Sequence, residues 1–229
     1  MRAGRESSRE RLQLAARRLY AEVGFEATTT AAIARAAGTS QSQFVKHFGD
    51  KQGVLAAILE GAWGELLSAV RLATERVEAP QDRFRLALDM LLSYLARERE
   101  FRAIWLREGL HLARRAGGTT YAEFLALLDE IFREMLLAGE LLPHVNTRAL
   151  RSGVMGAMAN MLYYSDVVAE TGAALPFSED EVRHTVLSFL AGSKVQAERT
   201  PAMAEPAEPP WVTRYMELAE KVLGPGGRA

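Results

Sequence analysis

The chain has 229 residues, of which 48% are hydrophobic and 25% are charged, and it contains no cysteine. This composition supports a packed core, excludes a chain that is disordered throughout, and leaves no disulfide or thiolate metal site. The formal net charge is −1, but residues 1–53 carry nine Lys and Arg against five acids, a net +4, and the remainder carries −5. A basic first part on an acidic remainder is expected when one end of a chain meets an anionic partner.

Helical periodicity dominates the chain, and its first helices are short and close together. An apolar stripe runs along residues 8–23. Thr30 is a suitable N-cap for a short helix over residues 31–37, and Gly38 separates that helix from another over residues 40–47. Two short helices joined by a glycine-containing turn are typical of a helix-turn-helix unit.

Longer helices are expected in the rest of the chain. Asp50 is the expected cap of a long helix that begins at Lys51, and Pro80 stands at the start of the next one. Ser178, with Glu181 three residues later, forms a capping box for a late helix. The sequence therefore predicts an all-α protein. The other expected helices cover residues 101–113, 119–135, 147–171, 178–197 and 211–223.

The segment AGTSQSQFVKHF, residues 37–48, is rich in Ser and Thr, which are poor interior helix formers. In a helix-turn-helix unit, the N-terminal residues of the second helix face base edges in the major groove. Short hydroxyl and amide side chains can form hydrogen bonds there, and hydroxyl and cationic groups around the edge suit phosphates. A polar surface helix of an ordinary bundle is the alternative explanation. The expected DNA-binding residues are Thr29, Thr30, Thr39, Ser40, Gln41, Ser42, Gln43, Lys46, His47 and Lys51.

Several residues between positions 24 and 55 also match, at the same spacing, the sequence pattern of a known protein family. They are Gly24, Phe25, Thr29, Thr30, Ile33, Ala34, Ala37, Gly38, Ser40, Phe44, Phe48, Lys51 and Leu55. At these spacings, about residues 8–56 resemble the N-terminal domain of the tetracycline-repressor (TetR) family. One departure is Val45, because the family usually has a phosphate-binding tyrosine there. The loop over residues 139–146, which leads into a long helix, also looks like the family's C-terminal half.

The resemblance implies an all-helical homodimer that binds double-stranded DNA at a pseudo-palindromic operator. It also implies a small-molecule effector that controls the spacing of the two recognition helices from the C-terminal domain. The expected parts are a helix-turn-helix DNA-binding domain over residues 1–53, a helical ligand-binding and dimerisation domain over 54–199, and a proline-rich linker with a final helix over 200–229. We expect the helix from Lys51 to be the only rigid element that joins the first two parts.

The C-terminal domain is rich in Met and aromatic side chains, which can line a pocket for apolar ligands but more often form plain core. Arg102, Glu108, His111 and Tyr163 are candidates for fixing a polar end of the ligand. The candidate ligand-binding residues are Phe101, Trp105, Phe124, Leu128, Met158 and Tyr163.

The last two long helices are the expected dimer face. Small residues on the earlier helix allow close approach, and an apolar stripe on the later one offers a partner surface, although the same residues could equally face the protomer's own core. The residues are Gly153, Gly156, Ala157 and Ala159, with Val182, Val186, Phe189 and Leu190.

Other classes of function have little support. The chain lacks a glycine-rich phosphate loop, a nucleophile elbow and a catalytic Cys/His grouping, so we expect neither an enzyme nor a cofactor. The four histidines have no helical metal spacing, and the longest uncharged segment, residues 152–165, is too short to span a bilayer. We expect a cytoplasmic regulator that acts as a repressor. A helical scaffold or partner-binding protein is the alternative.

Overall fold

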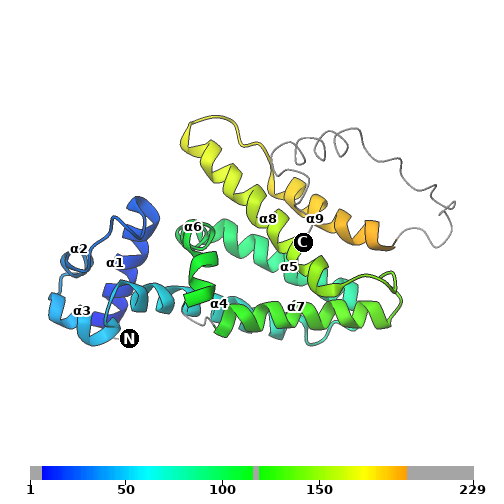
Figure 1. Ribbon diagram of the computed structural model, residues 1–229, viewed down its shortest axis with the longest axis horizontal. Coiled ribbons are helices and arrows are strands. Elements are labelled where there is room, and N and C mark those ends of the chain that lie inside the picture. The colour runs from blue at the N-terminus through cyan, green and yellow to red at the C-terminus, as the bar shows by residue number, and fades with distance from the viewer. Residues whose placement is uncertain (1–6, 116–118, 195–229) are drawn as a thin grey trace, which may run out of the picture. The chain divides into compact units, whose positions relative to one another are not determined.

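The computed structural model describes residues 7–115 and 119–194, and the side chains in these ranges except those of residues 109–119 and 191–194. Within those ranges the chain is all-α, as the periodicity predicted, and forms nine helices without a strand (Figure 1). The expected helix over residues 211–223 lies outside the described residues. The helices are α1 (Ser8–Val23), α2 (Thr30–Ala36), α3 (Gln41–Phe48), α4 (Lys51–Thr74), α5 (Pro80–Arg97), α6 (Arg99–Arg115), α7 (Thr119–Leu137), α8 (Thr147–Glu170) and α9 (Glu179–Lys194).

Side-chain caps define where the short helices begin. Helix α2 starts one residue earlier than expected, so its N-cap is Thr29 rather than Thr30, and the Ala32 amide donates to the Thr29 hydroxyl at 3.1 Å. Ser40 caps α3 in the same way, accepting from the Gln43 amide at 3.3 Å. These caps satisfy backbone donors that would otherwise have no partner at the helix ends, so both short helices have defined starts.

The apolar residues form two separate cores. We call the first the head core, formed by α1, α2, α3, the first turns of α4 and one residue of α6, and the second the body core, formed by α4 to α9. Periodicity places Ile33, Ala34, Ala37, Phe44 and Phe48 in the core of the helix-turn-helix unit. The first four are buried in the head core, and Phe48 is only partly buried against it. The helix-turn-helix unit therefore has its own small apolar interior.

Helix α4 contributes to both cores. Its first turns place Leu55 and Ile58 in the head core, and its later turns place Trp63 and Leu66 in the body core. By length and composition alone, α4 is also long and apolar enough to cross a membrane, although 44% of that window is buried inside the protein. Packing between two cores accounts for its apolar character.

Helix α6 also joins the head to the body, which corrects the expectation that the helix from Lys51 is the only connection. Ile104 of α6 is 1% exposed and belongs to the head core. Beside it, Arg17 of α1 forms an ion pair of 2.5 Å with Glu98, the residue before α6. Arg107 of α6 donates to the Ala21 carbonyl of α1 at 3.2 Å. The head is therefore held by two helices of the body.

Helices α8 and α9 pack against each other and against the rest of the body (Figure 1). The expected capping box is present, because the Ser178 amide donates to the Glu181 carboxylate at 2.7 Å and the Glu181 amide donates back to the Ser178 hydroxyl at 3.2 Å. Three residues of the expected dimer stripe on α9, Val182, Val186 and Leu190, are buried in the body core instead. An i, i+4 stripe does not reveal which neighbour it packs against.

Candidate nucleic-acid interface and ligand cavity

Helix α3 is anchored by one aromatic residue and turns its polar residues outward. Phe44 is 0% exposed and stacks on the half-buried Phe48, with ring centroids 5.9 Å apart. The side chains of Gln41, Ser42 and Lys46 are exposed. This arrangement agrees with the division of the segment into an apolar anchor and a polar face, which is what a recognition helix needs.

Hydrogen bonds order the start of this polar face. The Gln41 amide nitrogen donates to the Thr30 hydroxyl at 3.2 Å, which connects α3 to the first turn of α2. The Ser40 and Ser42 hydroxyls lie 2.8 Å apart. Thr39, which is half-buried, donates its backbone amide to the Ala34 carbonyl at 3.0 Å and closes the turn. The hydroxyl and amide groups are thus held in place before any partner binds.

Lys46, His47 and Lys51, which the sequence predicts to donate to phosphates, differ in their surroundings. Lys46 is exposed, and no hydrogen bond or ion pair joins it to another described residue. His47 places Nε2 2.7 Å from the Ser8 hydroxyl of α1. Among these three, Lys46 is the group best placed to reach a phosphate.

Lys51 faces the interior of the head. Its ammonium group donates to the Phe25 carbonyl at 2.9 Å and to the Glu26 carbonyl at 3.2 Å, and it lies 4.6 Å from the centre of the Phe25 ring. These contacts fasten the α1–α2 loop to the start of α4. A contact between Lys51 and DNA stays a prediction, and the structure gives this side chain a role inside the head.

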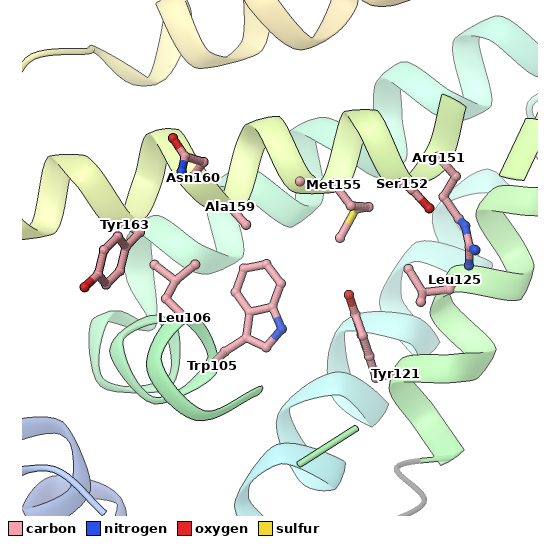
Figure 2. Close-up of a pocket in the computed structure, with 11 residues that line it drawn as sticks. Trp105, Leu106, Tyr121, Leu125, Arg151, Ser152, Met155, Ala159, Asn160 and Tyr163 are labelled. Atoms are coloured by element: carbon pink, nitrogen blue, oxygen red, sulfur yellow. The ribbon is translucent and has the colours of Figure 1, made fainter. Parts of the chain in front are cut away.

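A cavity of about 470 Å³ lies in the body, between α6, α7 and α8 (Figure 2). Its volume falls in the range of about 300–1,000 Å³ that is usual for small-molecule sites. The lining is mainly apolar and aromatic, with a few polar groups. The lining residues are Trp105, Leu106, Tyr121, Leu125, Arg151, Ser152, Met155, Gly156, Ala159, Asn160 and Tyr163.

Two of the six predicted ligand-binding residues, Trp105 and Tyr163, line this cavity. The other four are not among its lining residues and are buried in the body core, where the alternative interpretation placed them. These four are Phe101, Phe124, Leu128 and Met158.

The prediction missed most of the cavity wall, because it favoured the largest apolar residues. Two of them pack against Trp63, whose ring centre lies 5.7 Å from that of Phe101 and 5.2 Å from that of Phe124. Tyr121 and Arg151 carry polar groups, so a search for large apolar side chains does not identify them. The i, i+4 spacing of Tyr121 and Leu125 on α7 could have indicated a shared face.

The polar groups of the cavity are of two kinds. Arg151 is paired with Asp129 at 3.2 Å, and both side chains are largely buried. Tyr121 is half-buried, and burial raises the pKa of its hydroxyl, an effect that the nearby Arg151 partly offsets. The hydroxyl therefore stays protonated at neutral pH and can donate a hydrogen bond.

A second depression, between α1, α6 and α8, holds charged residues. Arg102, a candidate for fixing the ligand's polar end, lies here and donates to both oxygens of Asp166, at 3.1 and 2.5 Å. Arg107 pairs with Glu170 at 2.9 Å. These pairs join α6 to α8. The side chain of His111 lies outside the described residues, and no group of three His, Asp or Glu among the described residues could hold a metal ion.

Comparisons with known proteins agree with this architecture. A model of the bacterial regulatory proteins of the tetR family matches residues 14–58, which contain α2 and α3. No curated protein sequence matches the chain.

Solved structures resemble the whole described fold. The fatty acid degradation regulator FadR from Bacillus halodurans is 19% identical with a TM-score of 0.68, and the match covers 81% of this chain and 95% of that one. FadR from Bacillus subtilis, in complex with stearoyl-CoA, is 18% identical with a TM-score of 0.69 (81% and 98% covered). The ketosteroid regulator KstR2 of Mycobacterium tuberculosis is 17% identical with a TM-score of 0.64 (84% and 97% covered).

These likenesses show the shared fold, and the family model identifies the head. The head of the chain therefore has the DNA-binding domain of the tetR family of bacterial regulatory proteins, and the chain is a DNA-binding transcriptional regulator.

Proposed function

We propose that this regulator is a cytoplasmic repressor that binds a pseudo-palindromic operator as a homodimer and leaves it when a small, largely apolar ligand enters the body. The observation that carries the proposal is the outward polar face of α3, held on the fully buried Phe44. Ser40 caps the helix, but neither burial nor capping accounts for the exposed Ser42 and Lys46, and their value lies in contacts with base edges and phosphates.

The cavity supports an apolar effector. Trp105, Leu125 and Met155 form much of its wall, and its volume suits a drug-sized molecule. The structural neighbours point the same way, since one is described as a complex with stearoyl-CoA and another as a ketosteroid regulator. Both of those names refer to molecules with a large hydrocarbon part.

The exposed sides of α8 and α9 support a homodimer. Gly153 is exposed on α8, where a helix of a second protomer could approach closely. Phe189 on α9 is 44% exposed and Tyr164 on α8 is 52% exposed, so apolar area remains uncovered on both helices. Paired heads would then meet half-sites in successive major grooves, about 34–36 Å apart.

Repression would end by a shift in population. A ligand that prefers a conformation with differently spaced heads lowers the fraction of dimers that fit both grooves. The proposal includes the division of the chain into a DNA-binding domain over residues 1–53, a ligand-binding and dimerisation domain over 54–199, and a linker with a final helix over 200–229.

The test is fluorescence anisotropy with duplex DNA that flanks the protein's own gene, in a series of salt concentrations. We expect specific binding by two chains per operator, with log K falling by about 0.9 per neutralised phosphate for each unit of log salt. Gln43→Ala should relax the base preference and cost about 1–3 kcal/mol on the best sequence, whereas Lys46→Ala should weaken all sequences alike and reduce the salt slope by about 1.

Arg85→Ala is the matched control, because Arg85 is an exposed cation on α5 of the body. It should leave both the affinity and the salt slope unchanged. If Gln43→Ala and Lys46→Ala weaken all sequences equally, Gln43 does not read bases. If the wild-type chain ignores the DNA at low salt, it is a helical scaffold or partner-binding protein instead.

A further inference from the structure

Among the lining residues, two aromatic side chains carry a hydrogen-bond donor for which no partner is found among the described residues. The indole nitrogen of Trp105, from α6, is directed towards Tyr121, from α7, and the Tyr121 hydroxyl is directed towards α8 (Figure 2). Their ring centres lie 6.4 Å apart in an edge-on arrangement. An N–H and an O–H in an apolar cavity are costly to leave without an acceptor, so the site favours a ligand that supplies one.

The charge of the cavity is already balanced. Arg151 is the only ionisable cation or acid among the described lining residues, and Asp129 lies 3.2 Å from its Nε. A ligand carboxylate would bring a second negative charge next to this pair. Because an unpaired charge in a largely buried site is expensive, the existing pair favours an uncharged polar group on the ligand.

We propose that the cavity selects a ligand that carries an uncharged carbonyl oxygen on an apolar body, and that Tyr121 and Trp105 donate to this oxygen. The proposal rests on the proposed function and defines the chemical class of the effector. The apolar body lies against Leu125, Met155 and Ala159, and a ketone, ester or thioester supplies the required acceptor.

Tyr121 and Trp105 have a different role from that of the third aromatic residue in the cavity wall, Tyr163. Tyr163 also lines the cavity, but its hydroxyl points away from Trp105 in Figure 2, and the residue is 48% exposed. Tyr163 therefore contributes ring surface rather than a hydrogen bond to the carbonyl. The two tyrosines make a matched pair, since removal of the hydroxyl is the same chemical change at both positions.

The experiment measures dissociation constants of the full chain by equilibrium dialysis, with probes that share a carbon skeleton. One set is 2-dodecanone, dodecane and dodecanoic acid, and the other is benzophenone, diphenylmethane and diphenylacetic acid. In at least one set, wild-type protein should bind the ketone about tenfold more tightly than the hydrocarbon, and more tightly than the acid. Tyr121→Phe should remove most of this preference by weakening the ketone alone, and Tyr163→Phe should leave it unchanged.

Trp105→Phe is the second variant and should also reduce the ketone preference, with thermal unfolding to verify that both proteins fold. An equal affinity for ketone and hydrocarbon, or a preference that survives Tyr121→Phe, overturns the inference while leaving an apolar ligand site in place. Tighter binding of the acid overturns it as well and assigns the polar end to Arg151. If no probe of either set binds, the inference and the apolar effector of the proposed function fail together.

Discussion

The head of this regulator carries its functional groups on the outer surface, whereas the body carries them inside, around a cavity. In the head, the polar groups of α3 point outward and come from one continuous segment around the buried Phe44. In the body, the polar groups of the cavity point inward and come from three helices, at Trp105, Tyr121 and Arg151. A surface site requires only a well-packed core beneath it, whereas an interior site requires a cavity within the core.

Loss of the head core should produce the largest effect. Phe44→Ala removes a fully buried ring, and such changes cost about 3–5 kcal/mol. We expect chemical denaturation to show that loss and anisotropy to show loss of operator binding. Because Phe44 is not part of the body core, the variant should still bind the ligand of the body.

Val45→Ala on the same helix is the control. Val45 is 53% exposed, so the free energy of unfolding should change by less than about 0.5 kcal/mol. Equal destabilisation by both changes would mean that α3 is not anchored as described.

The junction of α3 and α4 should show a smaller effect. A Cβ at Gly53 would collide with the Phe48 carbonyl oxygen, so Gly53→Ala forces the end of α3 away from the start of α4. Overpacking of this kind costs about 1–3 kcal/mol. We expect a lower midpoint in urea and weaker operator binding, because the recognition helix is displaced.

Gly61→Ala tests the same substitution further along α4. The nearest atom to a Cβ at Gly61 is Gln13 Nε2 at 3.8 Å, an ordinary contact. This variant should gain about 0.5–1 kcal/mol, because alanine favours a helix interior. A loss at both glycines would refute the steric explanation.

The smallest effect should come from the ion pair between the head and the body. The pKa of Glu98 lies below its ordinary value of 4.5, and the largest cause is the hydrogen bond that Arg17 donates to its carboxylate. A carboxyl group whose pKa is lower in the folded state stabilises the protein at any pH above its pKa in the unfolded state. This stabilisation is lost as the pH falls through its pKa in the folded state. Glu98→Gln should therefore cost less than about 1 kcal/mol at neutral pH, measured by urea unfolding, and the difference should vanish below pH 4.5. A difference that is independent of pH would exclude the charge of Glu98 as its cause.

The head could be predicted from the sequence because its determinants are local. Gly38 marks the turn, Ser40 caps α3, and Phe44 identifies the buried side, all within seven residues. The interior role of Lys51 could not be predicted, since its partners Phe25 and Glu26 lie a loop and two helices earlier.

The body could be predicted only as a set of helices. Apolar periodicity identifies the side of a helix that is buried, but not which neighbour covers it or where the packing leaves a gap. Phe124 and Tyr121 lie three residues apart on α7, and only Tyr121 lines the cavity. Similarly, Val186 and Phe189 of α9 belong to one apolar stripe, but Val186 is buried in the protomer and Phe189 is exposed.

Helix α6 has neighbouring residues in two compartments. Ile104 is packed in the head core, and Trp105, the next residue, forms a wall of the cavity. A molecule that pushes on the indole cannot turn or slide this stretch of helix without dragging the isoleucine through close-packed surroundings. At this point of α6, one peptide bond separates a residue that contacts the ligand cavity from a residue packed in the DNA-binding head.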